Sequence, residues 1–136
     1  MIEILVGLSL VVGLAMAGIL NFSRVKRREG LQAVAFKMVE LLEKARNKSL
    51  TGEGDTGWKV VVGQTSLSLQ DTQDQVSENY NVTSGYELSG PVGEVIFQRV
   101  SGLVEECANE CVFEVGETGG NLNYQIKVLS SGGVEY

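Results

Sequence analysis

Two patterns of hydrophobic residues divide the chain into a helical first part and a strand-rich remainder. The opening stretch, MIEILVGLSLVVGLAMAGIL, carries one charged residue, Glu3, and residues 4–20 are free of charge. As a helix, this uncharged run spans roughly 25 Å, close to the lower limit for crossing a bilayer. A signal peptide is the main alternative, but its apolar stretch would follow basic residues rather than an acid. We therefore predict a hydrophobic transmembrane helix over residues 1–22.

The pattern then becomes amphipathic without a break. Apolar residues recur at spacings of three and four, which places them on one helical face: Leu31, Val34, Ala35, Met38, Leu41, Leu42 and Ala45. The glycine-rich TGEGDTG that follows residue 50 ends the pattern,. We predict that residues 23–50 continue the same helix, giving a rod of roughly 75 Å. A compact domain cannot bury such a rod, so its first half must enter a membrane or pack against copies of itself.

The remaining residues, 51–136, have the shorter period of β-strands. Runs rich in β-branched and aromatic residues, several alternating apolar and polar, predict antiparallel strands at 58–62, 66–70, 94–100, 111–115, 122–129 and 133–136,. The polar stretch between residues 69 and 93 reads as a long surface loop with at most one edge strand near residues 80–82. We predict an α+β fold: a globular antiparallel β domain over 51–136, with a small sheet covered by the second half of the helix.

Charge is distributed unevenly along this chain. Residues 23–48 hold eight of the eleven basic residues and three acidic ones, whereas the residues after 48 hold three basic and thirteen acidic ones. Because phosphate binding needs clustered lysine and arginine on an accessible face, we predict that this chain binds no nucleic acid directly. The basic cluster RVKRR directly follows the apolar run, as a solvated collar at a membrane surface does.

The two cysteines, Cys107 and Cys111, stand four residues apart, and the chain has no histidine. A zinc site would therefore lack ligands. We predict a disulfide, which holds an exposed acidic loop and places this part outside the cytoplasm; the alternative is two buried thiols on one helical face. Four loop carboxylates could offer oxygen to calcium, but their spacing fits no EF-hand loop: Asp55, Asp71, Asp74 and Glu78. We predict neither a metal nor another cofactor.

Enzyme chemistry has little support in this sequence. Without histidine there is no Ser-His-Asp triad or Cys-His pair,. The chain also lacks a phosphate-binding loop and a dinucleotide fingerprint,. We predict that it is not an enzyme.

The apolar opening with its single early carboxylate resembles the N-terminal segment of type IV pilins and of the pseudopilins of type II secretion. Glu3 matches the family's glutamate, and the resemblance covers roughly the first fifty residues. In the strand-rich part, IFQRVSG and IKVLSSGGVEY resemble the last strands of small pilins grouped with the H subunit of type II secretion. The resemblance implies the pilin fold, with the second half of the helix packed on the sheet.

The family also implies how this chain would act. In pilins, the glutamate neutralises the N-terminal amine of the neighbouring subunit and sets the axial register of a fibre. Applied here, Glu3 is the assembly residue, and the packing residues of the filament core are Ile4, Leu5, Leu8, Leu10, Val12, Gly13 and Gly18. The implied partners are identical subunits in a helical filament, the inner membrane before assembly, a prepilin peptidase and the pilus assembly machinery. The implied location is an extracellular pilus fed from a membrane-embedded pool.

The sequence departs from the family pattern in three respects. It shows no leader ending in glycine, and the family usually has two more residues before the glutamate, so we expect a processed or trimmed form. The family's proline at the end of the apolar run is replaced by Leu20, and its mid-run glycine falls at Val12, beside Gly13. Because glycine lowers helix propensity but no proline is present, we expect at most a short unwound stretch between Gly13 and Asn21.

Two other functions remain open at this stage. The chain could be a minor pilin or pseudopilin of a secretion system, or a membrane-anchored binding domain that does not polymerise. The positive-inside rule favours the anchored domain in one respect, because it would hold the basic cluster, and with it the sheet, in the cytoplasm. The cysteine pair favours the outside.

Overall fold

One helix, α1 (Ile2–Thr51), opens the structure. The computed structural model describes residues 2–54 and 56–136, so Met1 and Asp55 of the sequence predictions lie outside the described residues. The helix ends in a Schellman motif. Gly52 has a φ of 69°, its N–H bonds the Ser49 carbonyl, and the Glu53 N–H reaches back to the Lys48 carbonyl. Glycine adopts this left-handed conformation without a Cβ penalty, so TGEG ends the helix where the sequence predicts.

The helix is continuous between Gly13 and Asn21. The short unwound stretch that we allowed for in this region is therefore absent. Glycine costs about 1 kcal/mol of helix propensity relative to alanine, but it keeps its N–H and the hydrogen bond that the N–H makes. Only proline removes that donor and clashes with the preceding turn. Glycines at 13 and 18 are thus not sufficient to unwind this helix.

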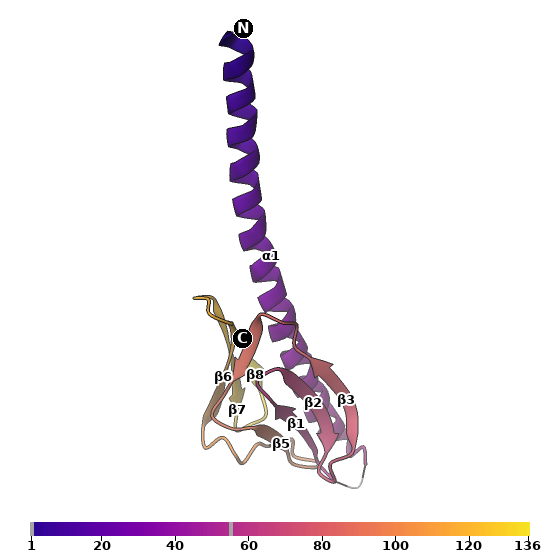
Figure 1. Cartoon of the computed structure of the whole chain (residues 1–136). Coiled ribbons are helices and arrows are strands. Elements are labelled where there is room, and N and C mark those ends of the chain that lie inside the picture. The colour runs from indigo at the N-terminus through magenta and orange to yellow at the C-terminus, as the bar shows by residue number, and fades with distance from the viewer. Residues whose placement is uncertain (1, 55) are drawn as a thin grey trace. The chain divides into compact units, whose positions relative to one another are not determined.

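The described chain separates into two compact units, Met1–Gly30 and Leu31–Tyr136. The second unit contains the last turns of α1 and eight strands, which form two four-stranded antiparallel sheets (Figure 1). The first sheet has the order β3-β2-β1-β5, and the second has the order β4-β6-β7-β8. The strands are β1 (Trp58–Val62), β2 (Ser66–Asp71), β3 (Val76–Asn81), β4 (Tyr86–Ser89), β5 (Glu94–Phe97), β6 (Glu110–Glu117), β7 (Asn123–Leu129) and β8 (Val134–Glu135).

The α+β class and the six predicted strand regions are confirmed, but the sheet is not single. The polar stretch predicted as a long loop with one edge strand near residues 80–82 contains two strands: β3, which overlaps that position, and β4, which was not predicted. Each lies at the edge of a different sheet, and β3 is mostly exposed. The predicted strand over 94–100 ends at Phe97, because Val100 takes a φ of 70° that an extended strand excludes,.

The core lies between the helix and the inner faces of both sheets. Every residue of the predicted helical stripe is buried, from Leu31 to Ala45. Strand alternation supplies the other side, as in β6, where Cys111, Phe113 and Val115 are buried while their neighbours are not. Helix and strand residues belong to one hydrophobic cluster. The second half of α1 therefore packs on the sheets as the 3.6-residue period predicts.

Candidate functional site

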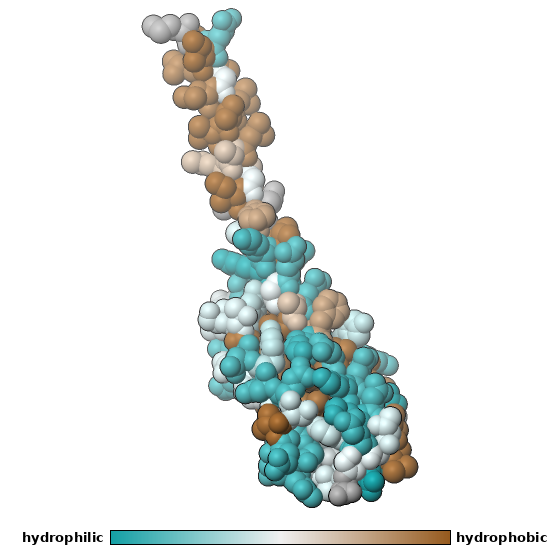
Figure 2. Space-filling view, turned by 90° about the vertical axis from the view of Figure 1, so that its right-hand side faces the viewer, coloured by the Kyte–Doolittle hydropathy of each residue, from teal (hydrophilic) through white to brown (hydrophobic). Residues whose placement is uncertain are grey.

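The exposed first part of α1 is the most unusual surface of this chain. All side chains from Ile2 to Ile19 are exposed, and Figure 2 shows this segment as almost continuously hydrophobic. None of its most apolar 18-residue window is buried within the chain. We call residues 2–19 the apolar segment. Soluble proteins rarely leave so large a hydrophobic surface uncovered, so this segment requires a partner or a bilayer.

The apolar segment has no polar side that could face water. Eleven of its eighteen positions carry large, exposed hydrophobic side chains, and these point in all directions around the helix,. Its one hydroxyl between Ile4 and Ile19, on Ser9, donates to the Val6 carbonyl at 2.8 Å and is satisfied within the helix. A helix that is hydrophobic all round suits lipid or a bundle that surrounds it, rather than the surface of one domain. By length and composition, it could serve as a membrane anchor or a signal sequence,.

The structure places the predicted assembly residues together on this helix. Glu3 lies exposed in the first turn, where the helix dipole favours a negative charge. The predicted packing residues are all exposed, at positions 4, 5, 8, 10, 12, 13 and 18. A Cβ added at Gly7, Gly13 or Gly18 would meet no atom within 4 Å. These glycines therefore leave open places at which another helix could approach closely.

A basic collar, defined as Arg24, Lys26, Arg27 and Arg28, follows the apolar segment after an interval of four residues. All four side chains are exposed. The Lys26 ammonium lies 4.9 Å from the centre of the Phe22 ring, a cation–π distance,. No carboxylate within the described residues forms an ion pair with Arg24 or Arg28. The collar therefore presents positive charge outward.

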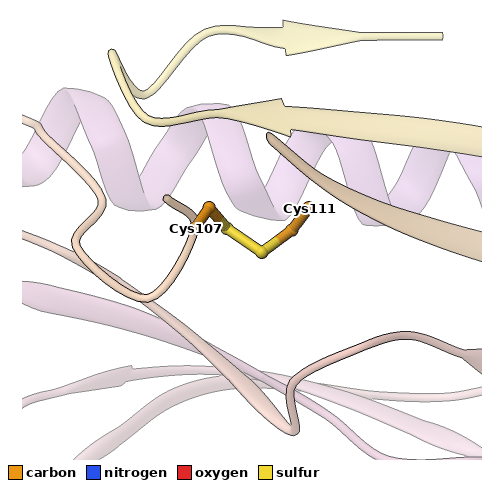
Figure 3. The surroundings of a disulfide bond; sticks show 2 residues. All are labelled: Cys107 and Cys111. Atoms are coloured by element: carbon orange, nitrogen blue, oxygen red, sulfur yellow. A yellow bond between two sulfur atoms is a disulfide. The ribbon is translucent and has the colours of Figure 1, made fainter. Parts of the chain in front are cut away.

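Cys107 and Cys111 form a disulfide (Figure 3), with their Cα atoms 5.3 Å apart. The predicted bridge is thus present, but it is not part of an exposed loop. Both cysteines are at most 3% exposed and belong to the hydrophobic core. Of the apolar residues near the bridge, Val104 is buried, while Leu103 and Ala108 are exposed. The bridge therefore ties the segment before β6 into the core, and the acids of that segment remain outside.

Three of the carboxylates considered for calcium, Asp71, Asp74 and Glu78, have local partners, and the fourth lies outside the described residues. Asp71 accepts hydrogen bonds from the backbone of Gln73 and Gln75, and Asp74 pairs with Lys59 at 2.5 Å. Glu78 pairs with Lys37 at 2.8 Å and with Lys44 at 2.5 Å. Within residues 2–54 and 56–136, no group of three or more acidic or cysteine side chains could hold a metal ion. These carboxylates have structural roles in turns and ion pairs.

The Glu78 ion pairs make stability depend on pH in the acid range. Hydrogen bonds from Lys37 and then Lys44 lower the pKa of Glu78 from 4.5 to about 2. A carboxyl group whose pKa is lowered by folding stabilises the protein above its unfolded pKa, and the contribution is lost as the pH falls through the folded value. This contribution is thus complete above about pH 4.5 and disappears towards pH 2.

We expect Glu78→Gln to lower the free energy of unfolding by about 1 kcal/mol at pH 7, since two partly exposed ion pairs are lost. The difference from the wild type should shrink as the pH falls from 4.5. The measurement is urea unfolding of the full chain in detergent micelles, with the exposed Glu106→Gln as the matched control. A difference that does not change with pH would contradict the ion-pair explanation.

Ser49 is a residue that the sequence analysis missed. It is the one fully buried polar residue of the described chain, and it lies one turn beyond Ala45 on the same helical face. Its hydroxyl accepts a hydrogen bond from the backbone N–H of Trp58 at 3.0 Å and donates one to the backbone carbonyl of Phe97 at 3.1 Å. Its carbonyl accepts a hydrogen bond from the Val100 N–H. The end of α1 is thereby joined to β1 and to the segment after β5.

Comparisons with known proteins identify no relative of this chain. A scan against protein-family models, a search of curated proteins and a search of solved structures each find no match.

Proposed function

We propose that this chain is the structural subunit of an extracellular filament of the type IV pilus kind. The observation that carries this proposal is the apolar segment: a helix hydrophobic on all sides, continuous with the helix that forms the core of the β domain. Such a segment can move from lipid into a bundle of identical helices without exposing its surface to water. The same helix therefore suits both a membrane-embedded pool and a fibre core.

Two further features support a pilin rather than a general membrane anchor. Glu3 provides one charge near the start of the segment, where a fibre could pair it and an anchor has no need of it,. The resemblance of the first fifty residues to pilins agrees with the helix-on-sheet packing of the second unit. A pilin fold, a prepilin peptidase, pilus assembly machinery and a role in adhesion, motility or DNA uptake belong to this proposal.

One alternative, which a specific observation supports, is a membrane-anchored domain that does not polymerise. The basic collar next to the apolar segment is its support, because such clusters hold a helix end at an anionic surface,. A minor subunit of a pilus or secretion pseudopilus is the other alternative within the filament class.

Expression of the full chain in cells that contain a pilus assembly system would test the proposal. We expect chains in the material sheared from the cell surface, as helical filaments by electron microscopy. Hydrogen exchange in those filaments should be slow for the amides of residues 2–19. Retention of all chains in the membrane fraction, with no crosslinks between copies, would contradict the proposal and favour the anchored domain.

A further inference from the structure

The outer face of the second sheet carries an excess of acidic side chains. In β6, the inward residues alternate with Glu110, Val112 and Glu114. The strand register places further outward residues beside them: Glu114 is opposite Ser89 and Gln125, and Lys127 is opposite Val112 and Glu135. Glu87 lies on the same side of β4. We call the four glutamates Glu87, Glu110, Glu114 and Glu135 the acidic sheet face.

The internal partners of these acids leave most of their charge unneutralised. Lys127 is the single basic residue on the described outer face, and its ammonium is 3.9 Å from a Glu110 oxygen. Glu114 accepts a hydrogen bond from the neutral Gln125 amide at 2.9 Å. Four carboxylates and one ammonium therefore make this face strongly negative, and β-strands in an antiparallel sheet hold them in fixed register.

A shallow hollow at the β7–β8 side of this face has the chemistry of an arginine site. It has a volume of about 270 Å³ and is lined by Gln125, Lys127, Glu135 and Tyr136. The Tyr136 ring makes an edge contact with Phe36, with ring centres 5.8 Å apart. Both rings are more than half exposed. A guanidinium group can pair with a carboxylate while it lies on an aromatic ring, which an ammonium group does less well.

The basic collar of the same chain supplies two arginines in a suitable arrangement. Arg24 and Arg28 are four residues apart on α1, so they lie on one side of the helix, whereas Lys26 lies on the opposite side,. Neither Arg24 nor Arg28 has a carboxylate partner among the described residues.

Charge complementarity between the two units identifies the partner as a second copy. Residues 1–30 contain four basic and two acidic residues, whereas residues 31–136 contain seven basic and fifteen acidic ones. Contact between the collar of one copy and the sheet face of another leaves a free collar and a free face at the two ends. Such a heterologous contact can repeat without closing, which is the requirement for a filament.

We propose that the acidic sheet face of one copy docks the Arg24–Arg28 side of the basic collar of a neighbouring copy, with these two arginines directed at Glu114, Glu135 and the Tyr136 hollow. This inference rests on the proposed filament and adds a contact outside its apolar core. The apolar segment supplies affinity but is alike on all sides, whereas the charged contact selects one orientation between neighbours.

A charge swap tests the contact. We expect Arg24→Glu with Arg28→Glu to reduce the amount of sheared filament at least tenfold relative to the wild type. Adding Glu114→Arg and Glu135→Arg to that chain should restore the amount to within about threefold. The matched controls are Lys26→Glu, which changes one charge on the opposite side of α1 and is compared with Arg24→Glu alone, and a rescue attempt with Glu105→Arg and Glu106→Arg. The control substitution on α1 should leave the amount of filament close to that of the wild type. The control rescue should not restore the amount of filament.

Each outcome has a defined meaning. Full filament yield from Arg24→Glu with Arg28→Glu would overturn the docking contact and leave the proposed filament intact. Loss without rescue, together with less chain in the membrane fraction, would show that the collar binds anionic lipid headgroups instead. Wild-type chains that form no filament would overturn both proposals. Urea unfolding of each variant in detergent micelles shows whether the fold is retained.

Discussion

Glu3→Leu is expected to leave the chain folded and membrane-bound but to reduce sheared filaments at least tenfold. A carboxylate that leaves water for a helix bundle must be paired, and a pair that has lost one partner is less stable by about 3–5 kcal/mol. Since about 1.4 kcal/mol is a tenfold change in affinity, the loss of one such contact per subunit is sufficient to prevent polymerisation. The measurement compares sheared and membrane fractions, with intact mass to show that both chains begin at the same residue.

Glu29→Gln is the matched control for this experiment. Glu29 is another exposed glutamate on α1, but it lies outside the apolar segment. The Glu29→Gln chain should form filaments in wild-type amounts. A Glu3→Leu chain that also forms filaments normally would show that Glu3 serves only the local helix dipole or reaches the headgroup layer, and the register role would be wrong.

The helix was predictable because helix-compatible sequence runs for fifty residues without interruption, first apolar on all sides and then amphipathic. Apolar positions from Leu31 to Ala45 repeat at helical spacing, and all of them are buried. The sequence also identifies the apolar segment and the cysteine pair, since both depend on local composition. What local composition could not show is that the disulfide belongs to the core. That property depends on which strands and loops cover Cys107 and Cys111.

β3 was predicted only in part and β4 not at all, for one physical reason. β3 and β4 are both edge strands, so each pairs on one side only. The sequence VSENYN of β3 buries little and shows no apolar alternation, although it pairs with β2 over most of its length. Their existence depends on ladder hydrogen bonds to β2 and β6, which leave no signal in composition,. For the same reason, the division into two sheets was not predictable.

The acidic sheet face was also hidden in the sequence, for a related reason. Its glutamates come from positions 87, 110, 114 and 135, and only the strand register brings them to one side of one sheet. Before the register is known, they are indistinguishable from other solvated acids. Tyr136 becomes informative only through its contact with Phe36, one hundred positions away in the chain.

Ser49→Ala is expected to lower the free energy of unfolding by about 3 kcal/mol, although it removes a single oxygen atom. The substitution leaves the Trp58 N–H and the Phe97 carbonyl without the hydroxyl that they share, in a site with no exposure. Each buried polar group that loses its partner costs about 1–3 kcal/mol. The helical period continues to position 49, so the signal that a polar residue lies in the core was available but unused.

The measurement is urea unfolding of the full chain in detergent micelles. Circular dichroism is the signal rather than tryptophan fluorescence, because Trp58 itself contacts the altered site. Ser89→Ala, at an exposed position of β4, is the matched control and should change the free energy of unfolding by less than about 0.5 kcal/mol,. If Ser49→Ala is as stable as this control, then Trp58 and Phe97 must find other partners. The hydroxyl would then have no part in holding the end of α1 against β1. A loss near 3 kcal/mol would instead make Ser49 the polar contact that fixes the position of the helix over the sheets.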